Sequence, residues 1–201
     1  MRSSNESPAV VGGYRRPPRR TADHIPTDAQ EQLGERLYNV FITHVPSHWI
    51  RQSWLRLFGA KIGRRTSIMM HTRVHGIKQL TIGDNCSIGF RCLLDARGAL
   101  TIDDCVVLAS DVQMITGHHV VDSDDFRIVM SPIHIAHHAW IASRSTIVAG
   151  VDIGPGAVVG ACSLVRDDVE PMAVVAGVPT RQVGIRNSKL QYAPDFRPLL
   201  Y

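Results

Sequence analysis

Aromatic residues are scarce in this 201-residue chain, at 6% of the total, although hydrophobic residues make up 44%. A core is therefore possible, but it has to be built from Ile, Val, Leu and Ala rather than from large rings. No apolar run reaches the roughly 18 residues that a membrane-spanning helix needs, and no segment resembles a signal peptide. The length fits one domain with a small appendage, and we expect a cytoplasmic protein.

Cysteine is also uncommon, and the four cysteines include no C-x-x-C pair. The sequence therefore offers neither a disulfide framework nor a cysteine-based zinc site. We expect the four residues to be structural thiols in a reducing compartment.

The part of the chain after residue 20 has no excess of positive charge. The net charge is +4, and the whole excess lies in residues 1–20, which hold five arginines and one glutamate. Residues 1–30 are also rich in Ser, Pro and Gly, a composition that cannot bury enough apolar surface to fold. We predict a mobile basic N-terminal arm over residues 1–30 and no nucleic-acid partner for the rest.

Residues 31–60 have apolar positions at helical spacing and form a predicted helical cap. Pro46 divides them into two helices, and Ser47 is a typical N-cap for the second. The second helix carries two tryptophans beside Arg51 and Arg56, which also suits a helix that lies weakly on a membrane surface. We favour the simpler interpretation, in which the helices pack over an open end of the main domain.

A period of six residues governs the chain from residue 61 to about residue 183. Apolar residues open successive six-residue units, and three units make a coil of 18 or 20 residues. The residue four positions after most opening residues is small or β-branched, as at Thr66, Cys86 and Ser145. The opening residues are Ile62, Ile68, Val74, Ile82, Ile88, Leu94, Ile102, Leu108, Met114, Ile135, Ile141, Ile147, Ile153, Val159 and Val165. Such an internal repeat decides the fold.

The repeat predicts a mostly β protein in which short strands and tight corners form stacked triangular coils. Each coil pairs its backbone with the next, so the two ends of the stack need caps. Residues 61–183 are therefore the predicted β-helix, preceded by the helical cap and followed by a C-terminal tail at residues 184–201.

The repeat breaks after Met114. The next unit is due near Asp122 but opens at Ile135, so about 13 residues are expelled as a loop within residues 118–132. Insertions in solenoids tend to gather on a binding face. His118 and His119 at the base of this loop suit general base chemistry near neutral pH.

Asp95 lies one coil before Met114, in the same region of the prism as the two histidines. Its carboxylate could bind a substrate hydroxyl or fix a histidine tautomer. Hydrogen bonding within a corner of the coil is an equally good interpretation.

Residues 62–183 resemble the hexapeptide-repeat acyltransferases, and most closely the galactoside, maltose and colanic-acid acetyltransferases. The resemblance rests on the sequences His-Ala-Trp-Ile-Ala-Ser at 138–143, Val-Val-Ala-Gly-Val-Pro-Thr-Arg at 174–181 and Leu-Phe-Gly-Ala-Lys-Ile-Gly at 57–63. It implies a left-handed parallel β-helix, a homotrimer with sites between neighbouring chains, and acetyl-CoA or another acyl-CoA as cosubstrate without a metal.

The resemblance also assigns roles to residues. In the family the catalytic histidine stands five residues after the opening residue that precedes the loop, which selects His119 and leaves His118 to line the acceptor pocket. Counting from the Thr-Gly pair selects His118 instead, but the coil fixes the opening residue in space. The family's coenzyme A contacts fall on Trp140, Ser143, Ala161, Arg166 and Arg181, although Asp167 stands where galactoside acetyltransferase has a lysine.

The expected reaction is transfer of an acyl group, most simply acetyl, from acyl-CoA to a hydroxyl of a sugar or glycolipid. The colanic-acid resemblance points to polysaccharide biosynthesis. Two alternatives are a noncatalytic β-helix trimer that acts as a scaffold and a zinc-dependent enzyme of the carbonic anhydrase type. The paired histidines favour catalysis over the first, and the closing Ala-Gly-Val-Pro motif favours acyl transfer over the second.

Overall fold

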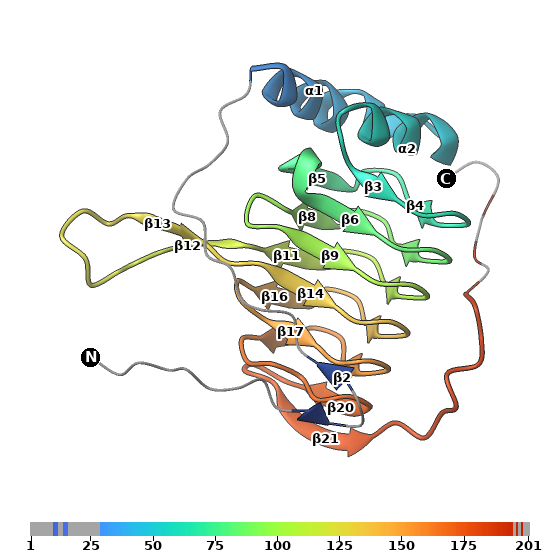
Figure 1. Cartoon of the computed structure of the whole chain (residues 1–201), viewed down its shortest axis with the longest axis vertical. Helices are drawn as coiled ribbons and strands as arrows, with labels where there is room; N and C mark the ends of the chain where they lie inside the picture. Colours follow the sequence, from blue (N-terminus) through green and yellow to red (C-terminus); the bar gives the residue numbers. More distant parts are fainter. Residues whose placement is uncertain (1–9, 12–13, 16–28, 195, 197, 199–201) are drawn as a thin grey trace.

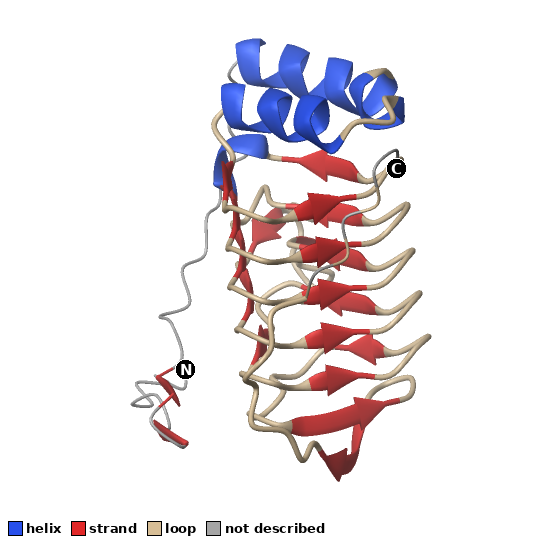
Figure 2. Cartoon of the chain, turned by 90° about the vertical axis from the view of Figure 1, so that its right-hand side faces the viewer, coloured by secondary structure: helices blue, strands red, loops and turns tan. Residues whose placement is uncertain are grey.

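The chain is a stack of triangular coils closed at one end by helices, in a computed structural model that describes residues 10–11, 14–15, 29–194, 196 and 198 (Figures 1 and 2). The mostly β solenoid with an N-terminal helical cap is thus confirmed. The predicted basic arm lies outside the described residues except for the start of the first helix and two short strands. These strands, β1 (Val10–Val11) and β2 (Tyr14–Arg15), pair antiparallel.

Three sheets form the faces of the prism. Face 1 consists of β3 (Lys61–Ile62), β6 (Leu80–Ile82), β9 (Leu100–Ile102), β14 (Ile133–Ile135) and β17 (Asp152–Ile153). Face 2 consists of β4 (Ser67–Ile68), β7 (Ser87–Ile88), β10 (Val107–Leu108), β15 (Trp140–Ile141), β18 (Val158–Val159), β20 (Ala173–Ala176) and the antiparallel edge strand β21 (Arg181–Ile185). Face 3 consists of β5 (Arg73–His75), β8 (Leu93–Asp95), β11 (Gln113–Ile115), β16 (Thr146–Val148) and β19 (Leu164–Val165).

The six-residue frame predicted from the sequence is the register of these sheets. On face 3, for example, Val74, Leu94, Met114, Ile147 and Val165 pair in line from coil to coil. Every opening residue after the first is buried, and the first packs partly buried against the same core. Because each coil contributes only three such side chains, the narrow interior is filled by aliphatic groups and has little use for rings.

The small residue that follows many opening residues has a separate physical reason. A Cβ atom placed on Gly83 would lie 2.7 Å from the backbone nitrogen of Asp104 in the next coil. The coils therefore stack too closely there for a side chain.

The inward corner positions belong to residues such as Cys86 and Cys92, and burial raises the pKa of both thiols to about 12. All four cysteines are free, and these two are held as unreactive thiols.

The cap consists of α1 (Ala29–Val40), the 3₁₀ turn η1 (Ile42–His44) and α2 (His48–Leu57), while a second 3₁₀ turn, η2 (Ile77–Gln79), lies in the first coil. The Ser47 hydroxyl accepts the N–H of Ile50, as expected of an N-cap. Tyr38 and Leu55 are fully buried against the first coil. The helices therefore cover the open end of the solenoid, as in the simpler of the two interpretations.

The structure removes Arg51 from the alternative interpretation, in which the second helix lies on a membrane surface. Arg51 is fully buried and donates hydrogen bonds to the carbonyls of Ile68, at 2.6 Å, and Val45, so it holds the cap on the first coil and cannot meet lipid headgroups. Trp49 and Leu57 remain exposed on the outer side. Among the described residues, no helix combines the length and apolar character needed to cross a bilayer.

The C-terminal segment leaves β21 and runs back along the outside of the prism to the cap (Figure 1). We call the described residues of 186–198 the strap. Arg186 starts it by donating to the His138 carbonyl and to the Tyr192 hydroxyl. Three strap carbonyls then accept side-chain hydrogen bonds: Tyr192 from His138 Nε2 at 3.0 Å, Phe196 from Ser67 Oγ at 2.9 Å, and Pro198 from His48 Nε2 at 3.0 Å.

Candidate active site

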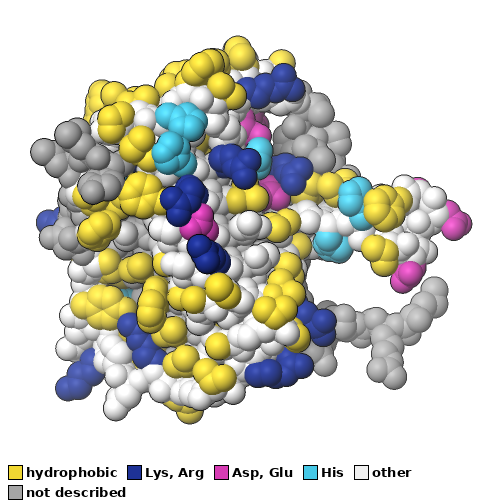
Figure 3. Space-filling model, turned by 180° about the vertical axis from the view of Figure 1, so that it is seen from behind, with side chains coloured by type: hydrophobic (Ala, Val, Ile, Leu, Met, Phe, Trp, Pro, Cys, Tyr) yellow, Lys and Arg dark blue, Asp and Glu magenta, His cyan; other side chains and the backbone are white. Residues whose placement is uncertain are grey.

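The break in the repeat is an antiparallel hairpin that leaves the prism at the corner between faces 3 and 1 (Figure 1). Its strands are β12 (Gly117–His119) and β13 (Ile128–Met130). Thr116 fixes its base, because the Thr116 hydroxyl accepts the N–H of Gly98 and the Thr116 carbonyl accepts that of Ser131. Figure 3 shows histidine and hydrophobic side chains along the hairpin and acidic ones toward its tip.

His119 is held in one orientation and one tautomer. Its Nδ1 lies 2.7 Å from the carbonyl oxygen of Phe126, and its ring stacks on the Phe126 ring at 4.3 Å with an interplanar angle of 8°. A carbonyl oxygen only accepts hydrogen bonds, so Nδ1 carries the proton and Nε2 has a free lone pair. Phe126 was missed in the sequence, although it lies within the break and is the break's only aromatic residue.

His118 has no such support. It precedes His119 on the same strand, so the two side chains point to opposite sides of the hairpin. Within the described part of the chain, no hydrogen bond to the His118 ring is found. The geometry of a prepared base therefore belongs to His119, while His118 is an exposed neighbour.

Asp95 lies beneath the hairpin, but its carboxylate is already engaged. The side chain is 3% exposed and forms a two-pronged ion pair with Arg97, at 2.8 and 3.0 Å. It also accepts the backbone N–H of Thr116 at 3.3 Å. Burial acts to raise the pKa of Asp95, but the hydrogen bonds and charge of Arg97 outweigh it and lower the pKa.

The corner interpretation of Asp95 therefore fits better than direct binding of a substrate. The group presented at the base of the hairpin is the Arg97 guanidinium, which lies close to Gly117. One guanidinium nitrogen would be 3.8 Å from a Cβ atom built on this glycine. Arg97 was not singled out in the sequence, although it stands two residues after Asp95 in the same corner.

Three of the residues predicted to contact coenzyme A lie together at the corner between faces 2 and 3. Ser143 and Ala161 occupy equivalent positions in successive coils, and the Ser143 carbonyl accepts the N–H of Cys162 at 2.9 Å. Trp140 is 46% exposed on face 2 beside them. The Ser143 N–H donates to no acceptor among the described residues, so it is available to a bound group.

The two predicted arginines lie apart. Arg181 opens β21 and pairs with Ala176 at the far end of face 2. Arg166 directly follows β19 at the edge of face 3, where its side chain approaches Asp167 at 3.7 Å. A single chain therefore places His119 and Arg166 at one edge of face 3 and Ser143, Ala161 and Arg181 beyond the other.

A separate cluster on face 1 surrounds His134. Its ring lies 2.8 Å from an Asp152 oxygen and 3.1 Å from an Asp103 oxygen, and the side chain is only 15% exposed. Burial acts to lower the pKa of His134, but the hydrogen bonds and charges of the two carboxylates outweigh it and raise the pKa to about 9. His134 is therefore a largely buried, ion-paired residue of face 1.

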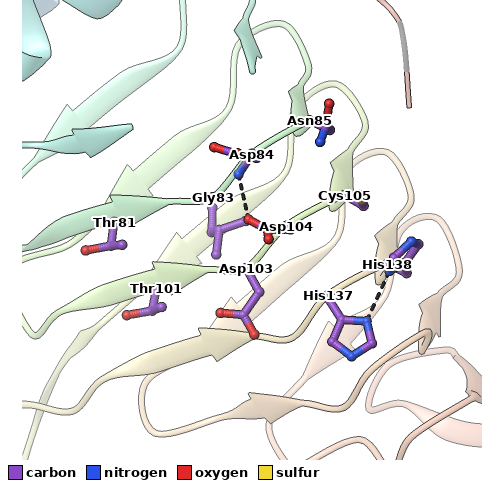
Figure 4. Close-up of a pocket in the computed structure, with 11 residues that line it drawn as sticks. Thr81, Gly83, Asp84, Asn85, Thr101, Asp103, Asp104, Cys105, His137 and His138 are labelled. Carbon is purple, nitrogen blue, oxygen red and sulfur yellow. Dashed lines mark hydrogen bonds between the residues drawn. The ribbon is translucent and has the colours of Figure 1, made fainter. Parts of the chain in front are cut away.

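A polar pocket of about 470 Å³ adjoins this cluster at the corner between faces 1 and 2 (Figure 4). Asp84, Asp104, His137 and His138 line it, but its carboxylates are used in stacking the coils: an Asp104 oxygen accepts the N–H of Asp84 at 2.7 Å. Across the described residues, no group of three or more His, Cys, Asp or Glu side chains is arranged to hold a metal ion.

No family model matches the chain. Individual relatives do. The chain is 36% identical over 125 residues to the putative colanic acid biosynthesis acetyltransferase WcaF of Escherichia coli K12, a match that covers 62% of this chain and 69% of the relative. It is 29% identical over 183 residues to the galactoside O-acetyltransferase of the same organism, covering 85% and 90%.

Two solved structures share the fold. A hexapeptide-repeat acetyltransferase of Vibrio cholerae, complexed with acetyl coenzyme A, superposes with a TM-score of 0.69 at 26% identity and covers 80% of this chain and 87% of its own. A maltose O-acetyltransferase of Clostridium difficile 630 gives a TM-score of 0.70 at 25% identity, with 80% and 86% covered.

Proposed function

Because this chain belongs to the hexapeptide-repeat acetyltransferases, we propose that it transfers an acetyl group from acetyl-CoA to a hydroxyl of a sugar or glycoconjugate, with His119 as the general base. The observation that carries the proposal is the hydrogen bond from His119 Nδ1 to the Phe126 carbonyl, which leaves Nε2 free to accept a proton. Membership of an acetyltransferase family also sets aside the alternative of a noncatalytic scaffold.

The proposed reaction needs only groups that this chain supplies. The acceptor O–H gives its proton to His119 Nε2 as the oxygen attacks the thioester carbonyl carbon, and the N–H of Ser143 donates to the resulting oxyanion. The carbon–sulfur bond then breaks, and the imidazolium protonates the departing thiolate. A positioned base of this kind contributes about 10²–10⁴-fold to the rate.

A sugar acceptor is supported by the relatives, which are named for galactoside and colanic acid, and by the exposed position of His118 and His119, which leaves room for a bulky acceptor. The direct test is incubation of the purified protein with acetyl-CoA and a panel of monosaccharides and glycosides, with release of free thiol as the readout. We expect thiol release above the hydrolysis background with at least one sugar. The proposal would be contradicted if none of the sugars raised thiol release above the rate of acetyl-CoA hydrolysis alone.

We further propose that the working unit is a homotrimer, because one chain does not bring the base and the donor contacts together. The base lies on a hairpin that projects away from its own prism, whereas Ser143 and Arg181 lie beyond the opposite edge of face 3. A closed cyclic arrangement lets each hairpin reach the donor contacts of the next chain.

Mixing His119→Ala chains with Arg181→Ala chains tests the trimer, at an acetyl-CoA concentration well below the raised KM of the Arg181→Ala protein. Shared sites predict recovered activity in the hybrids, since some interfaces regain both original residues. The control is each variant mixed with itself. A fully active monomer in sedimentation would refute the trimer.

A further inference from the structure

A second pocket, of about 390 Å³, lies on face 2 between the coils and the strap. Its inner wall is formed by four successive coils, which contribute Met69, Phe90, Ala109 and Ser143 in that order. Its outer side is formed by Pro194 and Phe196 of the strap. The Phe196 carbonyl accepts a hydrogen bond from Ser67 of the first coil, so the strap is anchored beside the pocket at this residue.

The walls of this pocket are predominantly apolar. Val107 and Ala109 supply aliphatic surface, and Phe90 and Phe196 add two rings. A pocket with such walls favours an apolar occupant, because burying methylene groups in it removes them from water. The polar groups are serine hydroxyls, and Ser143 is the one that belongs to the proposed donor site.

The pocket continues the line of the proposed donor contacts. Arg181 and Ala161 lie below Ser143 in the stack, and the coil above Ser143 follows in register, because the N–H of Arg144 donates to the Ser110 carbonyl. The next coil repeats the contact, since the N–H of Asp111 donates to the Phe90 carbonyl. A donor that reaches Ser143 from below therefore points its acyl end upward into the pocket.

We propose that this pocket takes the acyl chain of the donor and that the enzyme accepts short linear acyl groups longer than acetyl, such as butyryl and hexanoyl. The inference rests on the proposed function, in which the thioester carbonyl lies at Ser143. From Ser143 to Phe90 the pocket spans two coil spacings, about 10 Å. A hexanoyl chain is shorter than that span, and an acetyl group leaves most of it unfilled.

The test is a comparison of dissociation constants of the intact protein for free CoA, acetyl-CoA, butyryl-CoA and hexanoyl-CoA, measured by titration calorimetry. Each fully buried methylene tightens binding by about fourfold, so butyryl-CoA is expected to bind up to about 15-fold more tightly than acetyl-CoA. Val107→Phe, on the partly exposed side of β10, fills the pocket and should reduce this butyryl-to-acetyl ratio by about tenfold. Phe196→Ala removes part of the strap wall and should shift the preference toward hexanoyl-CoA.

Phe41→Ala is the matched control, because Phe41 is as exposed as Phe196 but lies on the helical cap, at 63% against 60%. It should keep the original ratio. The inference is overturned if all acyl-CoAs bind the unaltered protein as acetyl-CoA does, or if neither pocket variant changes the ratio. Failure of the proposed function gives a different result, in which neither free CoA nor any acyl-CoA binds.

Discussion

Replacing His134 by glutamine should remove a stabilising contribution that depends on pH. In the folded protein the His134 ring lies between Asp103 and Asp152, and its pKa is about 9 instead of the ordinary 6.5. A shift of this size corresponds to about 3 kcal/mol, since one pKa unit is about 1.4 kcal/mol. Because the folded pKa is raised, the contribution is fully present below pH 6.5 and is lost as the pH rises through 9.

The assay is thermal unfolding of the original protein and of His134→Gln at pH 6 and at pH 9.5. In a chain of this size 1 kcal/mol changes Tm by about 2–4 °C, so the Tm difference between the two proteins should shrink by about 6–12 °C from pH 6 to pH 9.5. His137→Gln serves as the control, because it removes an exposed imidazole three residues away.

A direct readout of the same group is an NMR titration of the His134 ring, which should remain protonated at pH 8. A Tm difference between the original protein and His134→Gln that is equal at both pH values would refute the reasoning. So would an imidazole that titrates near 6.5.

Three predictions concern the site itself. His119→Ala should lower kcat by about 10²–10⁴-fold with the affinity for coenzyme A and Tm unchanged, whereas His118→Ala should be milder; a larger loss in His118→Ala, with both variants folded, would reverse the assignment. Phe126→Ala should lower kcat and leave the KM of the donor unchanged, because it removes only the ring that orients His119; a changed donor KM would give Phe126 another role. Arg181→Ala should raise the KM of the acyl donor far more than that of the acceptor, since arginine suits phosphate groups; equal changes would remove it from the donor site.

The repeating part of the fold could be predicted because the same physical constraint recurs in every coil. Met114 and Ile147 are inward and in register for the same reason, so an error at one position would have contradicted the others. The helical cap followed from Pro46 and Ser47, whose backbone preferences are local. Such features need no knowledge of distant contacts.

The site could be predicted only in part, because its details depend on contacts across coils. The sequence places His119 at a break but cannot show that Phe126 folds back to fix its tautomer. It places Asp95 beneath the break but not its pairing with Arg97, which decides that the carboxylate is occupied. The position of the strap beside Ser143 could not be predicted, because residues 186–198 lie outside the six-residue period and no pattern indicates what they pack against.

The strap also has a consequence for how the protein is made. Coils of a solenoid contact only their neighbours, so a growing chain can stack each coil on the one before it as it leaves the ribosome. The hydrogen bonds from Ser67 to Phe196 and from His48 to Pro198 join residues 129 and 150 positions apart. The first coil and the cap therefore gain these hydrogen bonds only after every coil has been made, and a chain truncated before Phe196 would contain every coil but lack both contacts.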